Sequence, residues 1–171
     1  MNKYFVSEIY PDALYTAGSQ REDIEEILQG IGYSPIHINT PERSLFSWFT
    51  LYKNVIINAK KLTPPGIVFF HFPIRSRAFR IFFELVRKKG FSTIVYEIDL
   101  EGLREGDKQL LDYEMKWLKK SNVIITQNKI KKDQSSQSIQ NKQIITYEMH
   151  DYLQQKNEIF QKERKKTTEI I

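Results

Sequence analysis

Short apolar segments alternate with longer amphipathic segments along most of this chain. The apolar segments fall at 3–9, 34–39, 67–70, 92–98, 122–126 and 143–146. Strands that are apolar on both faces, and that are separated by helices of about a dozen residues or more, favour parallel pairing through right-handed crossovers. The pattern therefore predicts an α/β fold: a doubly wound, Rossmann-like, mostly parallel sheet of about six strands with helices on both faces. We expect the strand order 3-2-1-4-5-6.

Four amphipathic segments are expected to form the helices. In the first, Ser19 and Glu22 match the capping-box pattern, which predicts that the helix begins there. Four apolar residues then recur at helical spacing: Ile24, Ile27, Leu28 and Ile31. Further helices are expected at 45–61, 74–89 and 107–120, the last beginning at Asp107. Glu114 lies within the apolar stripe of that last helix, so we expect it to be structural and paired with a donor or a cation.

Composition limits both the domain count and the site chemistry. A chain of 171 residues with 40% hydrophobic content can bury one sizeable core, so we expect one domain at 1–153 and a charged linker or helix at 154–171. The sequence has no cysteine and three scattered histidines, and it predicts neither a metal site nor a cofactor. It shows no signal peptide and no apolar run of bilayer length, so we expect a cytoplasmic protein.

The net charge of +5 is concentrated rather than evenly spread. Six basic residues, opposed only by Glu84, gather in one helical segment: Arg75, Arg77, Arg80, Arg87, Lys88 and Lys89. Such a run is either a solvated helix face or a patch that holds the chain near anionic lipid head groups, as a peripheral membrane contact. No nucleic-acid-binding motif accompanies it, so we expect no nucleic acid partner.

Chemically active side chains gather after the fourth predicted strand, at Glu97, Asp99, Glu101 and Arg104. In an open parallel sheet, ligands bind at the carboxyl ends of the strands where the strand order reverses, which we expect between 3–9 and 92–98. These carboxylates could bind sugar hydroxyls, act as a general base or hold a metal, although the composition predicts no metal site. Alternatively, Asp99 and Arg104 pair with one another while Glu101 faces water.

Two other strand ends contribute polar residues to the same edge. His71 follows the third predicted strand, as either a hydrogen-bonded structural residue or a ligand, and Asn128 follows the fifth. Across the expected crevice, Gly18 and the first N–H groups of a helix offer a place for a phosphate or a sugar oxygen. One glycine is not the three-glycine fingerprint of dinucleotide-binding domains. A receiver domain is excluded too, because it needs paired acids after the first strand and a lysine after the fifth.

Five segments, read in order, resemble a known family. They are Ala17-Gly18-Ser19, Phe70-His71-Phe72-Pro73, Asp99-Leu100-Glu101-Gly102-Leu103-Arg104, Ser121 to Asn128 and His150-Asp151-Tyr152-Leu153. Together they are similar to the N-terminal domain of bacterial two-domain glycosyltransferases of the GT-B type. This group contains β-1,6-galactofuranosyltransferases and the glucosyltransferases that extend glycans on serine-rich adhesins.

The resemblance implies transfer of a galactofuranosyl or glucosyl group from a nucleotide sugar to a glycan or lipid-linked acceptor of the cell envelope. It implies that a second domain binds most of the nucleotide, so that 154–171 leads into that domain and this chain alone is inactive. The residues that it suggests as catalytic are Asp99 and His71. Those that it suggests for substrate binding are Gly18, Ser19, Arg104, Glu97 and Asn128. The alternative is a non-catalytic binding or assembly module that docks on a partner or an anionic membrane through its basic helix.

Overall fold

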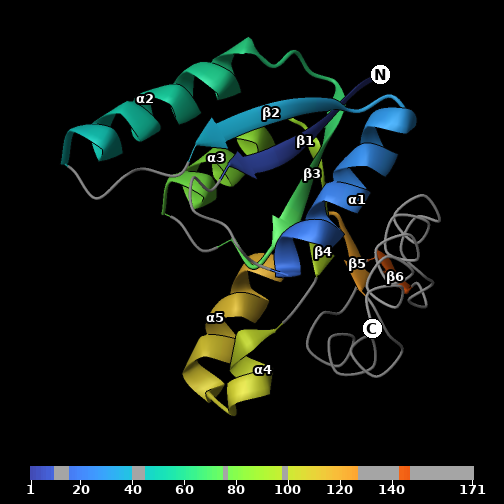
Figure 1. Cartoon of the computed structure of the whole chain (residues 1–171), viewed down its shortest axis with the longest axis vertical. Helices are drawn as coiled ribbons and strands as arrows, with labels where there is room; N and C mark the ends of the chain where they lie inside the picture. The colour runs from blue at the N-terminus through green and yellow to red at the C-terminus, as the bar shows by residue number, and fades with distance from the viewer. Residues whose placement is uncertain (10–15, 40–44, 75–76, 98–99, 127–142, 147–171) are drawn as a thin grey trace, which may run out of the picture.

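The computed structural model describes residues 1–9, 16–39, 45–74, 77–97, 100–126 and 143–146. Six strands form a single sheet: β1 (Asn2–Ile9), β2 (Ser34–Asn39), β3 (Gly66–Phe72), β4 (Ser92–Glu97), β5 (Val123–Thr126) and β6 (Gln143–Thr146). Every neighbouring pair is parallel, as Figure 1 shows. The predicted fold class, a Rossmann-like α/β sheet, is therefore confirmed. The predicted linker at 154–171 lies outside the described residues.

The predicted strand order was wrong. The sheet runs β2-β1-β3-β4-β5-β6, so that β3 lies between β1 and β4 and pairs with both. Apart from the partly buried Ile67, every residue of β3 is buried, with Phe69 on one face of the sheet and Phe70 on the other. A strand that is apolar on both faces is best placed in the middle of a sheet. The strand order therefore reverses between β1 and β3, not between β1 and β4.

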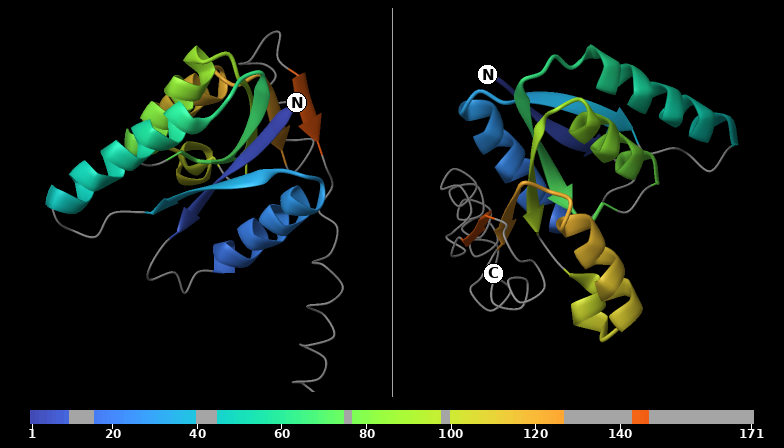
Figure 2. Two further views of the ribbon diagram at one scale, coloured as in Figure 1. Left: turned by 90° about the horizontal axis from the view of Figure 1, so that it is seen from above. Right: turned by 180° about the vertical axis from the view of Figure 1, so that it is seen from behind.

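Three helices cover one face of the sheet: α2 (Leu45–Lys61), α3 (Arg77–Lys88) and α5 (Lys108–Leu118). Figure 2 shows α2 and α3 on the side of the sheet opposite α1 (Thr16–Gly30). The buried residues of α3 are Ala78, Phe79, Phe82, Phe83 and Val86. The rings of Phe83 and Phe70 pack edge to face with their centroids 5.0 Å apart. This geometry stabilises the fold beyond the burial of the apolar surface of the two rings. The larger part of the core lies on this face.

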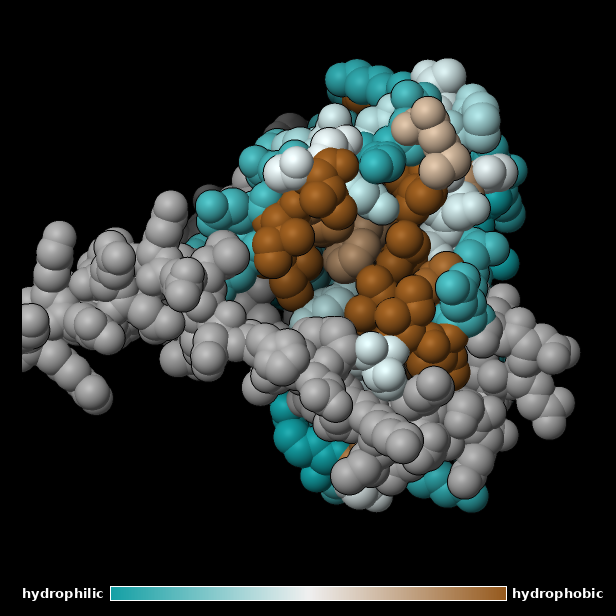
Figure 3. Space-filling model, turned by 90° about the vertical axis from the view of Figure 1, so that its right-hand side faces the viewer, coloured by the Kyte–Doolittle hydropathy of each residue, from teal (hydrophilic) through white to brown (hydrophobic). Residues whose placement is uncertain are grey.

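A smaller core lies beneath α1, on the other face. Leu28 packs there with Phe5, Phe69 and Tyr96, which come from three neighbouring strands. Toward the β6 edge this face of the sheet is less well buried, and Ile145 of β6 remains 43% exposed. Figure 3 shows apolar side chains gathered on this side of the molecule.

The start of α1 and the presence of one short helix differ from the prediction. α1 spans Thr16–Gly30, so Ser19 lies inside its first turns rather than at a cap. The first N–H groups of a helix need no acceptor within the helix, so a capping-box pattern does not by itself fix where a helix begins. A short helix that was not predicted, α4 (Glu101–Glu105), precedes α5. Five residues are too few to show a helical period.

The expected start of α5 was correct. Asp107 is its N-cap, and its carboxylate accepts hydrogen bonds from the N–H groups of Gln109 at 2.9 Å and Leu110 at 3.0 Å. This cap sets the direction in which α5 leaves α4.

Lys89 connects the ends of two neighbouring helices. It follows α3, and its ammonium donates to the carbonyls of Ala59, Lys60 and Leu62 at 2.8 to 3.0 Å. These carbonyls lie at the C-terminus of α2, where a helix concentrates negative partial charge and leaves acceptors without intrahelical donors. The contact fixes α2 against α3.

Candidate functional site

The reversal of strand order places a candidate ligand site at the carboxyl ends of β1 and β3. From these two strands the chain leaves in opposite directions, β1 toward β2 and β3 toward β4. Open α/β sheets bind their ligands at such a point. Phe5 pairs with Phe69 in the β1–β3 register, and Ser7 and His71, two residues further along each strand, therefore lie on the same face of the sheet.

A polar cluster lies at this point, between the sheet and α1. The Ser7 hydroxyl donates to Oε2 of Glu25 at 2.8 Å, and Oε1 of Glu25 is 3.8 Å from Nε2 of His71. Ser7 and His71 are 7% and 4% exposed, whereas Glu25 is half-buried. The His71 ring also meets those of Phe69 and Tyr96 edge to face. The cluster thus combines two strand side chains with a carboxyl group supplied by α1.

Burial decides the charge state of this cluster. It lowers the pKa of His71 to about 3, with the positive charge of Arg21 acting in the same direction, so the imidazole is neutral at pH 7. Burial also raises the pKa of Glu25, although the Ser7 hydrogen bond, Arg21 and His37 partly oppose that rise. The approach of Glu25 to His71 is therefore not an ion pair, and at 3.8 Å it is longer than a hydrogen bond.

This geometry is unlike that of a nucleophilic triad. Ser7 donates to the carboxylate rather than to the imidazole, so His71 does not activate it. A histidine with a pKa near 3 is also a weak base at neutral pH. Within the described part of the chain, neither nitrogen of His71 has a hydrogen-bond partner. The neutral ring therefore carries one donor and one acceptor at the strand ends, both of them buried.

The N-terminus of α1 lies at the same edge. Figure 1 shows this end of the helix beside the arrowhead of β3. Gly18 and Ser19 lie within the first turns of α1, where backbone N–H groups and the helix dipole favour negatively charged oxygens. These two residues thus lie near the strand reversal in the observed strand order as well as in the predicted one.

Glu97 does not join His71. In the β3–β4 register His71 is level with Tyr96, so the next residue, Glu97, points to the opposite face of the sheet. There Glu97 is level with Phe72 and Thr126 and is 0% exposed. A ligand at the α1 side cannot contact its carboxylate in this arrangement. Asp99 and Asn128, the other strand-end residues predicted for this edge, lie outside the described residues.

Arg104 lies on the exposed side of α4. Its guanidinium is 3.3 Å from the carboxylate of Glu105 and 3.9 Å from that of Glu101. Its side chain is 57% exposed, so these contacts are weak and leave the guanidinium accessible to solvent.

Glu114 is structural, as expected. It is 3% exposed, and its two carboxylate oxygens accept the N–H groups of Glu101 and Gly102, each at 3.0 Å. A buried carboxylate at a helix N-terminus satisfies N–H groups that have no acceptor within the helix. A methyl group on Gly102 would lie 2.2 Å from the backbone nitrogen of Leu111, so only glycine allows this approach. Glu114 and Gly102 together fix α4 on α5.

The sequence interpretation missed Ser7, Arg21 and Glu25 as site residues. A signal was present, because Ser7 follows Phe5 by two residues and therefore shares its buried face. On α1, Glu25 lies four residues after Arg21 and three before the buried Leu28. This helical spacing places both charged residues on the side of Leu28. Polar residues on a buried stripe near a strand end indicate a site.

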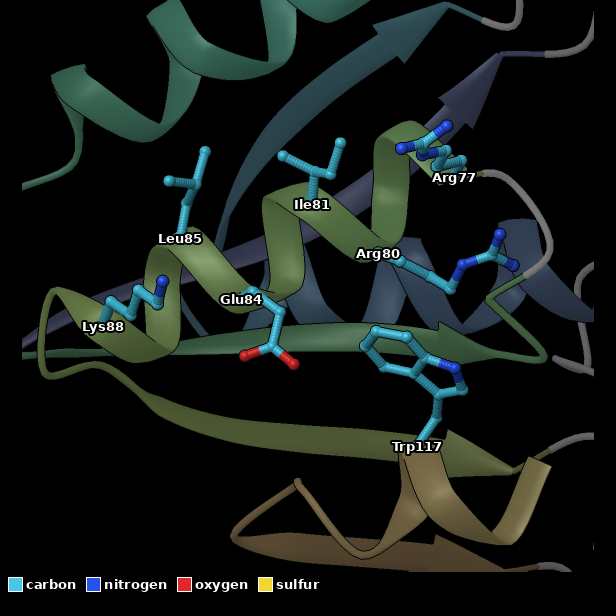
Figure 4. A pocket seen from close by; sticks show the side chains of 7 residues that line it. All are labelled: Arg77, Arg80, Ile81, Glu84, Leu85, Lys88 and Trp117. Atoms are coloured by element: carbon cyan, nitrogen blue, oxygen red, sulfur yellow. The ribbon is translucent and has the colours of Figure 1, made fainter. Parts of the chain in front are cut away.

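Other parts of the described structure carry less site chemistry. The described residues contain no group of three or more His, Asp or Glu side chains that could hold a metal ion. Among the described helices, none is both long and apolar enough to cross a bilayer. An open hollow of about 440 Å³ lies away from the switch point, on α3 beside Trp117 (Figure 4).

Fold and site together define a Rossmann-like α/β domain with a polar cluster at the switch point of its parallel sheet. The match to a protein family is more specific. Residues 3–149 match the model of the family described as Glucosyltransferase 3-like, N-terminal domain. The chain belongs to this family and is therefore a glycosyltransferase N-terminal domain. A search of curated proteins found no match.

Proposed function

We propose that this chain is the acceptor-side domain of a GT-B glycosyltransferase that transfers a hexosyl group, glucosyl or galactofuranosyl, from a nucleotide sugar to a glycan or lipid-linked acceptor. The observation that carries the proposal is the buried Ser7, Glu25 and His71 cluster beside the N-terminus of α1, in a domain of a glucosyltransferase-like family. Enzymes that handle charged, hydroxyl-rich ligands need oriented polar groups at such an edge.

The reaction assigns different tasks to the groups at this edge. A base takes the proton from an acceptor hydroxyl, the hydroxyl oxygen bonds to the anomeric carbon, and the nucleoside diphosphate leaves with the electrons of the broken bond. The N–H groups around Gly18 and Ser19 are suited to the phosphate and sugar oxygens that gain negative charge. Asp99 is our candidate for the base, because a carboxylate can accept that proton.

Neutral His71 is better suited to holding a substrate hydroxyl than to removing its proton, because its pKa is about 3. Arg104 is exposed and suits an acceptor contact, and Asn128 is proposed for the same rim. Glu97 is fully buried on the other face, which favours a structural role for it.

We also propose that a second domain binds most of the nucleotide, because this sequence has no three-glycine fingerprint. The proposal also includes a cytoplasmic location and an acceptor of the cell envelope or an adhesin glycan.

Calorimetry with UDP-sugars tests whether a second domain supplies most of the affinity for the donor. The isolated chain should bind them weakly, and micromolar affinity would contradict the proposed second domain. In an enzyme that contains both domains, Asp99→Ala should lower kcat by about 10²–10⁴-fold, the usual contribution of a general base. His71→Ala should mainly raise the acceptor KM. Full activity of both variants would remove these residues from the site.

A further inference from the structure

The combined net charge of α2 and α3 is more positive than the net charge of the whole chain. α2 has three lysines and no acid, and α3 has four basic residues and one acid. Their excess is thus six positive charges, against five for all 171 residues. The single acid, Glu84, pairs with Lys120 and with Arg87, and these partners lower its pKa against the opposing effect of burial. The outer side of these two helices is therefore cationic.

The outward side of α2 is also unusually apolar. Phe49 is 70% exposed, Ile56 43% and Ile57 36%, and Trp48 at the border of this stripe is 40% exposed. Phe49, Lys53, Ile56, Ile57 and Lys60 follow one another at i, i+4, i+7, i+8 and i+11, the spacing of a single helical face. Exposed apolar clusters rimmed by polar groups mark interaction sites. Here the rim is made of lysines.

The adjoining helix continues this surface. Arg77 and Lys88 are exposed at the two ends of α3 and line the hollow of about 440 Å³. Figure 4 shows Ile81 and Leu85 projecting from α3 between them, on the side away from Trp117. Exposed apolar side chains thus lie among cations on α2, and half-buried Ile81 and Leu85 lie between cations on α3, which packs directly against α2.

The opposite side of the sheet has the opposite charge. α1 carries four acids, Glu22, Asp23, Glu25 and Glu26, and one arginine, Arg21. Because α1 and the pair α2–α3 cover different faces, the described helices carry opposite charge on the two sides of the sheet (Figure 2). An anionic surface would attract one side of the protein and repel the other.

We propose that the outer side of α2 and α3 binds the surface of an anionic lipid bilayer. The apolar stripe of α2 enters the boundary between head groups and acyl chains, and the lysines and arginines contact lipid phosphates. Aliphatic side chains such as Ile56 and Ile57, set among cations, suit a lipid interface better than a nucleic acid or an acidic protein. This inference rests on α2 and α3 alone and does not depend on the proposed catalytic function.

Co-sedimentation of the full chain with vesicles tests the apolar contribution. Binding is expected to phosphatidylcholine vesicles that contain phosphatidylglycerol and not to phosphatidylcholine alone. The double variant Phe49→Ser, Ile57→Ser should bind at least tenfold more weakly. The control Ile27→Ser, Ile31→Ser removes two apolar residues of 50% and 57% exposure, one in α1 and one in the turn that follows it, and should bind as wild type does.

A second pair of variants tests the charges. Lys53→Glu with Lys60→Glu should weaken binding by about fivefold or more for each residue. Lys108→Glu with Lys116→Glu changes the total charge equally at exposed positions of α5 and should have a much smaller effect. Equal losses in the two pairs would show a response to net charge alone and would overturn the proposal.

Tryptophan fluorescence provides a readout at the surface itself. The chain has two tryptophans, so a Trp117→Phe background leaves Trp48 as the reporter. Its emission should shift to shorter wavelength with anionic vesicles and be quenched by lipids brominated on the acyl chain. Absence of both effects, or equal binding to neutral vesicles, would overturn the proposal. So would self-association without lipid that Phe49→Ser abolishes, because that would assign the surface to a second copy of the chain.

Discussion

Removing the Glu114 carboxylate should release α4 from α5. In Glu114→Ala, the N–H groups of Glu101 and Gly102 lose their acceptor, the first in a partly buried and the second in a buried position. Each buried donor left without an acceptor costs about 1–3 kcal/mol. We therefore expect a loss of about 3 kcal/mol in the free energy of unfolding. Each kcal/mol lowers the melting temperature of a chain of this size by about 2–4 °C, so the shift should be about 6–12 °C.

Urea denaturation followed by circular dichroism measures this loss, with Asp112→Ala as control. Asp112 is exposed on the same helix, and its variant should stay within about 0.5 kcal/mol of wild type. Glu114→Gln keeps one acceptor oxygen and should fall between the two. If α4 opens locally instead, hydrogen exchange at 100–105 should accelerate even when the global transition does not move. Unchanged stability together with unchanged exchange in Glu114→Ala would refute the reasoning.

Three further predictions concern other contacts. The pKa of His71 is about 3 in the folded chain and about 6.5 in the unfolded chain, so only the unfolded chain takes up a proton as the pH falls from 7 to 5. This residue should therefore lower the free energy of unfolding by about 2 kcal/mol between pH 7 and pH 5. His71→Phe should remove that part of the slope in urea titrations at several pH values, and an unchanged slope would contradict the assigned burial. Lys89→Met should cost about 1–2 kcal/mol by freeing the carbonyls at the end of α2, whereas Lys88→Met, one residue earlier and exposed, should cost little in the same assay. Gly102→Ala should lower the melting temperature as Glu114→Ala does, because its methyl group would meet the backbone of Leu111, and a neutral result would show that α4 can shift.

The fold class could be predicted because local patterns determine it. Strands apolar on both faces, separated by helices, leave few alternatives to a parallel sheet. Strand order is less constrained, since both the predicted and the observed order obey the right-handed crossover rule. The sign available in the sequence was the unbroken apolar run at 67–70, which makes β3 apolar on both faces and so favours a central position.

The candidate site was predicted in its location more than in its members. Strand ends point to an edge of the sheet, but which face a side chain occupies depends on the register, and this separates Glu97 from His71. Glu25 reaches the site from a helix that lies far from β3 in sequence, so only the packing of α1 shows the contact. α4 depends on Glu114, thirteen residues after its first residue, and no local pattern encodes it.

The position of the two proposed surfaces makes lipid binding and sugar transfer compatible. The Ser7, Glu25 and His71 cluster lies beneath α1, whereas the cationic and apolar surface lies on α2 and α3, across the sheet. A bilayer bound to α2 and α3 would leave the α1 side open to a donor-binding domain. Acidic α1 would also be repelled by anionic lipid, which keeps this orientation unique. Variants of Phe49 should therefore weaken vesicle binding without changing the KM of a soluble acceptor, and His71→Ala should raise that KM without changing vesicle binding.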